Sequence, residues 1–486
     1  MVIVTQLRLG TTAGRATLAA AVLASGMAFL DTTIVTVALP AIGEDLSAKL
    51  SGLQWTITGY TLTLAAFVLL GGALGDRHGR RRIFLVGVGW FTVASIACGF
   101  APTIEILIAS RILQGVGAAL LTPGSLAILQ SSFAPSDRAR VIGAWSGLSG
   151  VATAVGPFVG GWLIDALNWR AVFFLNVPLA VAVFWLGRRM PESRNPVARH
   201  TRFDVAGTVL GALGLAGLTY AMIATPEEGF GSPAVWAGFA VGLFCLVTFV
   251  AVERRRSRPG VGISDREGRP RIVAMMPMSL FRSRTFSLLN AYTVVVYGAM
   301  GGLLFFLAIQ LQTVAGYSAL EAGIATLPMT LLLLVGSGRS AALAARIGPR
   351  PQLVIGPLLC VAGTLLLLAV DENTLYWRDV LPGAIVFGLG LTAQVAPLTA
   401  SVLSAVDDTY AGIASGINNA AARAASLLAV AALPMIVGLA GAAYANPEAF
   451  NSGYHQALLW CAGGLAVGAL LAAFLRPPRR TPHFAL

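Results

Sequence analysis

The sequence predicts an all-α integral membrane protein with fourteen membrane-spanning helices. Of its 486 residues, 56 % are hydrophobic and only 11 % are charged, and the mean hydropathy is +0.78. A span needs about 20 mostly apolar residues, so fourteen spans use about 280 residues and leave short connections. This composition excludes a large soluble catalytic domain. The net charge of +12 implies no nucleic-acid partner, because an excess of arginine on one side is what orients membrane helices.

Apolar runs between charged or Pro/Gly-rich breaks give the fourteen spans. The first run stays apolar past any signal-peptide cleavage pattern as far as Pro40, so we expect it to remain an uncleaved span. The predicted spans are 16–40, 53–75, 83–101, 104–133, 141–163, 171–187, 204–224, 234–252, 286–311, 320–345, 352–370, 380–404, 411–440 and 456–475.

Basic residues divide unequally between the two sides of these spans. With the N-terminus inside, 27 of the 33 basic residues lie on the cytoplasmic side and three lie outside, while Arg111, Arg339 and Arg423 fall within spans. Positive residues favour the cytoplasmic side. We therefore expect both termini in the cytoplasm, in a multi-pass protein of the bacterial cytoplasmic membrane.

Two short patterns recur at one offset and at equivalent places. Residues 143–147 (GAWSG) match 412–416 (GIASG), and Arg77, Gly79 and Arg81 match Arg346, Gly348 and Arg350. Such a match indicates a duplicated six-span unit in parallel orientation. The predicted units are an N-terminal six-helix bundle (1–190), two inserted spans with their preceding loop (191–252), a linker (253–285), a C-terminal six-helix bundle (286–475) and a tail (476–486).

Residues with catalytic or metal-binding chemistry are sparse and scattered. No H-E-x-x-H or G-x-S-x-G motif occurs, and the single lysine, Lys49, is not part of a P-loop. We therefore expect no enzyme, no metal and no cofactor. The cysteines each stand alone in an apolar run and predict core packing, whereas the histidines are placed in connections or tails. These residues are Cys98, Cys245, Cys360, Cys461, His78, His200, His455 and His483.

Asp31 and Arg111 are charged residues inside predicted spans. Asp31 lies nine residues before Pro40, about 13 Å deep, and Arg111 enters its span from the same side to a depth of about 10 Å. A carboxyl group in the hydrocarbon must be neutral or paired and should face the bundle interior. Asp31 is thus the candidate proton carrier and Arg111 its regulating partner. A permanent structural ion pair is the alternative.

Two glycine-containing segments predict moving contacts. The loop after the second span combines a flexible turn with charges that can pair across to the other half, although arginine there is also required by topology. The fifth span carries small residues at spacings that let a neighbouring helix approach closely, with ordinary tight packing as the alternative. The loop residues are Gly75, Asp76, Arg77, Gly79, Arg80 and Arg81; the span residues are Gly147, Gly156, Pro157, Gly160 and Gly161.

Several polar side chains within spans are candidates for lining a substrate cavity. Helical rotation is not known from sequence, so each is weighed against ordinary packing. The candidates are Gln114, Tyr297, Gln310, Gln394, Asn418 and Arg423.

The most specific stretch, residues 30–40 (LDTTIVTVALP), resembles the first-span motif of the fourteen-span drug:proton antiporters of the EmrB/QacA type in the major facilitator superfamily. Thr36 stands where that family usually has asparagine. Residues 71–82, 111–117, 156–161 and 316–323 also match in order. The resemblance implies the major facilitator fold, two six-helix bundles with two inserted helices. It also implies export, because the fifth-span motif accompanies exporters, and it matches Arg423 to a family arginine.

These observations favour a proton-coupled exporter of amphipathic drugs or antibiotics that works by alternating access. The alternative keeps the fold and assigns a dedicated metabolite, antibiotic or siderophore, as an exporter or a symporter. The proton gradient is the expected energy source. The expected partners are a small amphipathic substrate, protons and the lipid bilayer, and the expected state is a monomer.

Overall fold

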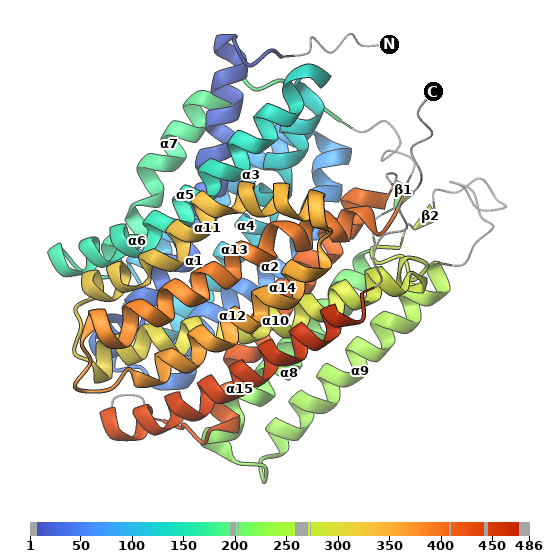
Figure 1. The fold of residues 1–486 in the computed structure, drawn as a ribbon. Helices are drawn as coiled ribbons and strands as arrows, with labels where there is room; N and C mark the ends of the chain where they lie inside the picture. Colours follow the sequence, from blue (N-terminus) through green and yellow to red (C-terminus); the bar gives the residue numbers. More distant parts are fainter. Residues whose placement is uncertain are drawn as a thin grey trace.

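The computed structural model shows long helices packed side by side (Figure 1). Within the described residues, the regular structure is helical except for β1 (Thr201–Arg202) and β2 (Arg271–Ile272), which pair in parallel. The described residues are 7–194, 201–202, 204–257, 271–272, 274–407, 410–441 and 446–475.

The N-terminal half contains the first seven helices. Thr11 starts α1 by accepting a hydrogen bond from the Gly14 amide at 3.1 Å, a common N-cap. The predicted end of this span at Pro40 is wrong, because α1 continues to Asp45; proline is tolerated in membrane helices that neighbours support. The predicted sixth span is divided at Leu175. The helices are α1 (Thr12–Asp45), α2 (Leu50–His78), α3 (Arg80–Gly99), α4 (Ile104–Ser132), α5 (Pro135–Ala166), α6 (Arg170–Phe174) and α7 (Asn176–Gly187).

Helices α8 (Val205–Glu228) and α9 (Pro233–Arg256) form an inserted antiparallel hairpin. Helix α8 packs against α2 and α14, so the hairpin contacts both halves. Only 22 % of the most apolar stretch of α9 is buried, as expected for a helix that faces lipid. Residues 253–256, predicted to begin the linker, still belong to α9. The Glu253 carboxylate there accepts a hydrogen bond from the Met276 amide at 2.8 Å.

The C-terminal half begins after a short 3-10 helix. Its last span starts well before the predicted residue 456, because Asn446 caps α15 through the amides of Glu448 and Ala449. His455, predicted to lie in a connection, is therefore inside α15. The elements are the 3-10 helix η2 (Leu280–Arg282), α10 (Arg284–Ile309), the π-helix η3 (Gln310–Val314), α11 (Ala319–Ile347), α12 (Arg350–Leu366), the 3-10 helix η4 (Leu367–Ala369), the π-helix η5 (Tyr376–Val380), α13 (Leu381–Ser404), α14 (Ala411–Ile436) and α15 (Pro447–Ala473).

Helix packing repeats between the two halves. Helix α1 packs on α5 as α10 packs on α14, and α2 packs on α4 as α11 packs on α13. The halves meet through α5 with α11 and through α14 with α2. Figure 1 shows α5 beside α11 in the upper left part of the molecule, with α9 along the lower right edge. A duplicated six-span unit produces this arrangement of paired contacts.

Thirteen helices of the described chain are long and apolar enough to cross a membrane. They include α6 and α7 taken together, and they leave out α5, a helix of 32 residues. The chain is thus a multi-pass membrane protein, and fourteen spans stay a prediction in which α5 supplies the remaining one.

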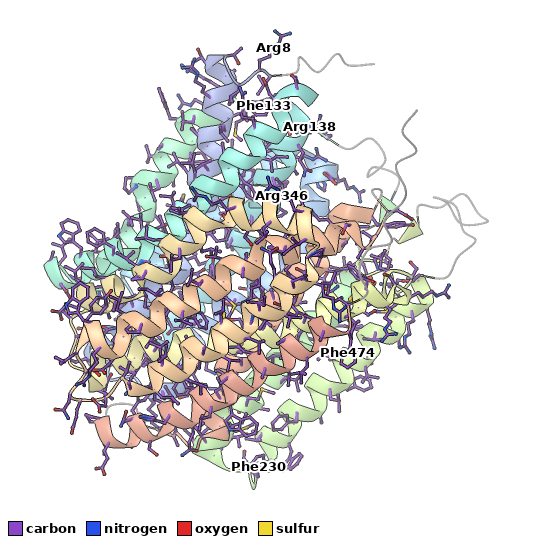
Figure 2. All side chains as sticks on the ribbon, viewed as in Figure 1. Arg8, Phe133, Arg138, Phe230, Arg346 and Phe474 are labelled. Carbon is purple, nitrogen blue, oxygen red and sulfur yellow. The ribbon has the colours of Figure 1, made fainter. Side chains whose placement is uncertain are left out.

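Sidedness remains a prediction with a direct test. Figure 2 shows Arg8 and Arg138 at one end of the bundle and Phe230 at the other. The four native cysteines are free and buried, so they are replaced before single cysteines are introduced at exposed Arg82 and Glu372. An impermeant maleimide should label position 82 in everted vesicles and position 372 in intact cells. Labelling of both positions from one side would contradict the span number between them.

Candidate functional site

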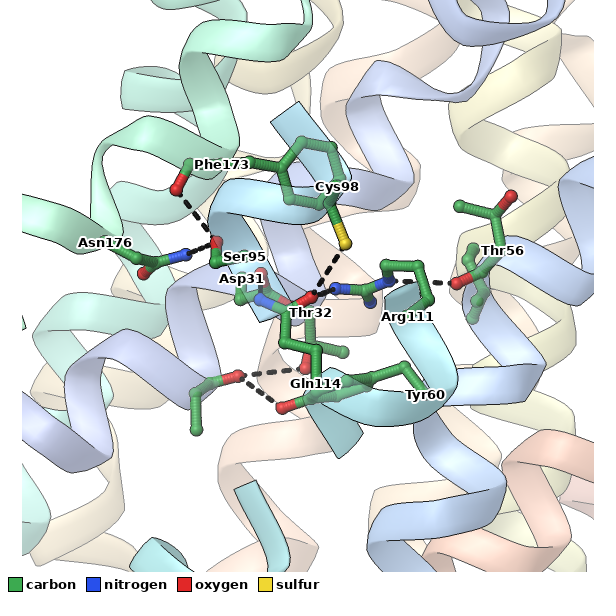
Figure 3. A network of polar contacts seen from close by, with 12 residues as sticks. Asp31, Thr32, Thr56, Tyr60, Ser95, Cys98, Arg111, Gln114, Phe173 and Asn176 are labelled. Atoms are coloured by element: carbon green, nitrogen blue, oxygen red, sulfur yellow. Dashed lines mark hydrogen bonds and ion pairs between the residues drawn. The ribbon is translucent and has the colours of Figure 1, made fainter. Parts of the chain in front are cut away.

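Helices α1 and α4 bring Asp31 and Arg111 into direct contact. Arg111 Nη1 lies 2.5 Å from Asp31 Oδ2, and the two residues are 2 % and 1 % exposed. The acidic and the basic residue that the sequence places at similar depth therefore form a buried ion pair, drawn in Figure 3. A buried pair is held firmly, because removal of one partner leaves an uncompensated charge and costs about 3–5 kcal/mol.

Gln114 forms hydrogen bonds with both members of the ion pair. Its Nε2 donates to Asp31 Oδ1 at 2.7 Å, and its Oε1 accepts from Arg111 Nη1 at 2.7 Å. Arg111 Nε donates to the Thr56 carbonyl oxygen at 3.0 Å. Both carboxylate oxygens of Asp31 therefore have a donor. Gln114, predicted to line a substrate cavity, is instead fully buried in this network, because it lies one helical turn from Arg111 on the same face.

Aromatic rings enclose the guanidinium group. The centroid of the Tyr60 ring is 4.3 Å from the Arg111 guanidinium carbon, and that of Phe173 is 5.9 Å away. Aromatic faces attract cations and exclude water. Tyr60 and Phe173 are new members of the site, and their ring contacts come from helix rotations that the sequence does not reveal. A proton that reaches Asp31 would neutralise one half of a water-shielded pair.

The residues predicted as a loop lie at the end of α2 and the start of α3, with Gly79 alone between the two helices. Asp76 pairs with Arg80 at 2.7 Å, and Arg80 also donates to the Ala127 carbonyl oxygen of α4 at 3.3 Å. Glu192, which the sequence analysis missed, accepts hydrogen bonds from the amides of Arg81 and Arg82. Among the described residues, the partners of Asp76 and Arg80 therefore lie in the N-terminal half and not in the other half, where they were expected.

Gly79 has a structural reason to be glycine. Its φ is +116°, a value that side chains strongly disfavour. A Cβ atom at this position would also lie 2.7 Å from the Glu192 carboxyl group. The turn therefore holds the loop against the segment that follows α7.

The small residues of α5 allow two neighbouring helices, α1 and α11, to approach its backbone closely. A Cβ atom on Gly156 would lie 2.2 Å from Thr33 Oγ1 of α1, and one on Gly160 would lie 2.5 Å from Ile34 Cγ2 of the same helix. Gly161 faces the other half, where a Cβ atom would lie 2.5 Å from the Ala319 carbonyl oxygen of α11. The side-chain surroundings of Gly147 lie outside the described part of the chain.

Pro157 takes part in the same interface between the halves. A Cβ atom on Gly323 of α11 would lie 2.3 Å from the Pro157 carbonyl oxygen. Close by, the Leu320 amide donates to the Asp165 carboxylate at 3.0 Å. These contacts join α5 to α11 at the end opposite the start of α1, so glycine at 161 and 323 lets the two backbones meet there.

A small polar cavity lies in the C-terminal half between α10, α13 and α14. Its volume is about 60 Å³, and it is lined by Tyr297, Thr399, Val402, Leu403, Ser415, Asn418, Asn419 and Ala422. Tyr297 and Asn418 were predicted to line a cavity. Thr399, Ser415 and Asn419 were missed, although Ser415, Asn418 and Asn419 recur at helical spacing and form one polar stripe in an apolar span.

Two other predicted cavity residues are held elsewhere. Gln394 accepts a hydrogen bond from the Tyr292 hydroxyl at 2.5 Å, and Gln310 donates to the Val370 carbonyl oxygen at 2.8 Å. Both side chains are at most 1 % exposed. Both hydrogen bonds join separate elements, so these buried amides pack helices together.

Comparison with known proteins agrees with the fold. The family model described as Major Facilitator Superfamily matches residues 21–430. A tetracenomycin C resistance and export protein of Streptomyces glaucescens is 33 % identical, with 85 % of this chain and 73 % of that protein covered. A puromycin resistance protein of Streptomyces alboniger is 35 % identical, with 91 % and 87 % covered. A multidrug resistance protein of Mycobacterium tuberculosis is 34 % identical, with 85 % and 73 % covered.

Solved transporter structures share the fold at low sequence identity. A peptide transporter crystallised with sulfate superposes with a TM-score of 0.66 at 14 % identity, covering 97 % of this chain and 96 % of that one. A nucleoside transporter gives 0.62 at 10 % identity, with 94 % and 99 % covered. The solved structures support the predicted major facilitator fold. The family match shows a transport protein and not an enzyme, as predicted. This chain belongs to the major facilitator superfamily, and its predicted resemblance to the drug:proton antiporters of that superfamily is confirmed.

Proposed function

We propose that the protein exports amphipathic drugs or antibiotics from the cytoplasm in exchange for protons. The two halves would expose a central binding region to the two membrane faces in turn. The observation that carries this proposal is the buried pair of Asp31 and Arg111, whose charges are 2.5 Å apart with aromatic rings around the guanidinium group. The proton gradient supplies the energy, and no bound cofactor is required.

The ion pair has the right energetic scale for coupling. Neutralising one partner of a buried pair costs about 3–5 kcal/mol. A shift of a two-state equilibrium from 1:99 to 99:1 takes about 5.5 kcal/mol. Protonation of Asp31 in this conformation leaves Arg111 unpaired at a comparable cost, which would favour a conformation that exposes Arg111 or pairs it again. The packing between α1 and α4, which the pair joins, is the contact that would change first.

Export as the direction of transport is supported by the relatives, whose names describe resistance and export. A dedicated substrate is the second candidate. Two of the relatives are named for one antibiotic each, whereas a third is named for multidrug resistance. A drug-susceptibility panel in a host without its own pumps separates these cases. Resistance to several unrelated amphiphiles indicates multidrug export, and resistance to one compound indicates a dedicated exporter.

Proton exchange is tested in everted membrane vesicles. Once a transported compound is known, its addition should release protons from the acidified interior, and an uncoupler should abolish its uphill accumulation. Vesicles without the protein are the control. Accumulation that persists after the proton gradient has been collapsed would contradict proton coupling and leave the transport fold unaffected.

A further inference from the structure

Arg423 carries a positive charge near the middle of α14, and the described chain provides no counter-ion for it. It lies near the middle of α14, about 18 Å from Ala411 at 1.5 Å per residue. No hydrogen bond or ion pair joins its guanidinium group to another described residue, in contrast to Arg111 with Asp31. A cation in the membrane interior is costly without a partner. Its presence therefore indicates a partner that is not a side chain of the described protein.

The surroundings of Arg423 connect it to the polar cavity. Asn419, which lines the cavity, precedes Arg423 by one helical turn and so lies on the same face of α14. On the other side, Arg423 lies within electrostatic range of the Tyr60 hydroxyl group. Arg423 thus sits between the cavity of the C-terminal half and the aromatic ring that covers Arg111.

The described surface near this position contains no free carboxylate. The cavity lining is neutral, with hydroxyl and amide groups as its polar members. Asp31 has donors on both of its oxygens and is 2 % exposed. An organic cation would therefore meet the positive charge of Arg423 with no accessible negative charge to offset it, and like charges repel strongly in a low-dielectric site.

We propose that Arg423 binds the substrate through an anionic oxygen acceptor, such as a carboxylate or phenolate, and that the protein selects anionic amphiphiles over lipophilic cations. This inference rests on the proposed export function. The planar guanidinium group presents several donors in a fixed arrangement that matches paired oxygen atoms. The hydroxyl and amide groups of the cavity then provide neutral hydrogen-bonding partners for the rest of the molecule.

The test compares two dyes with the same ring skeleton. Fluorescein carries carboxylate and phenolate oxygens, and rhodamine 123 is a cation built on the same xanthene rings. Binding to the purified full-length protein is measured by fluorescence anisotropy. We expect wild type to bind fluorescein at least about tenfold more tightly than rhodamine 123, as for loss of a charge-assisted hydrogen bond.

Variants assign the effect to the guanidinium group. Arg423→Gln should lower fluorescein affinity at least about tenfold. Arg423→Lys, which keeps the positive charge but loses the planar arrangement of donors, should lower the affinity less. Arg339→Gln is the matched control, because Arg339 is an exposed arginine of α11 that donates to its own helix at the Val335 carbonyl oxygen. It should bind fluorescein as wild type does. Monodisperse elution shows that each variant is folded.

Three results would overturn the proposal: wild type that binds rhodamine 123 at least as tightly as fluorescein, wild type that binds neither dye, or equal fluorescein affinity in wild type and both Arg423 variants. Vesicle transport of the same dyes separates this inference from the export proposal. Fluorescein binding without uphill transport would refute export and leave the assigned ligand chemistry in place. Uphill export of rhodamine 123 in preference to fluorescein would support export and refute the ligand chemistry.

Discussion

Asp31→Asn is expected to abolish proton-driven uphill export while the protein still inserts in the membrane. Asparagine keeps the size of the side chain but cannot lose a proton, so the side chain at position 31 is fixed in a neutral form. Substrate-induced proton release from energised everted vesicles should fall to the level of vesicles without the protein. Downhill substrate movement should remain measurable, because Asp31 is bonded to Arg111 and Gln114 and does not line the polar cavity.

A loss of stability could imitate this result, so the design includes a charge-balanced variant. Asp31→Asn leaves Arg111 buried without its counter-ion, at a cost of about 3–5 kcal/mol. The double variant Asp31→Asn with Arg111→Gln removes both charges and should recover stability but not proton release. Glu372→Gln, an exposed acid between α12 and α13, should behave as wild type. Undiminished proton release from folded Asp31→Asn would show that the proton uses another group.

Hydropathy alone predicts most of the helix arrangement, because burial in lipid requires long apolar helices. The errors occur where hydropathy gives no signal. Helix α1 continues beyond Pro40 because neighbouring helices support it, and α15 begins with a capped polar turn at Pro447 that contains no apolar run. The association of Asp31 with Arg111 follows from depth, since two charges at one level of the membrane gain most by meeting.

The composition of the polar cavity is harder to predict, because it depends on helix rotation. Gln114, Gln310 and Gln394 have the same chemistry as true cavity residues, yet each is bonded inside a bundle. Asn418 and Asn419 are adjacent in sequence and both line the cavity. Spacing along one helix does not separate the two groups, because Gln114 also lies one turn from a polar residue, Arg111. The rotation of each helix decides which polar side chains reach the cavity.

Gly161→Leu is expected to stop transport by keeping the two halves apart at one end. A Cβ atom alone would lie 2.5 Å from both the Ala319 carbonyl oxygen and Leu320 Cα, and backbone atoms cannot move aside as a flexible side chain can. Overpacking of this kind costs about 1–3 kcal/mol or more, and here it acts only on conformations in which α5 meets α11. The variant should therefore insert and fold but fail to complete the transport cycle.

The change in conformation is measured with a single cysteine at Leu320, whose amide bonds to Asp165 across the interface. In the Gly161→Leu background this cysteine should react faster with an impermeant maleimide, because α5 no longer shields it. Gly143→Leu is the matched control on the same helix, since no atom lies within 4 Å of a Cβ placed there. It should retain transport and the wild-type labelling rate. Equal transport and equal labelling in both leucine variants would show that α5 and α11 need no close contact during the cycle, and that the fifth-span glycines serve only to pack the resting structure.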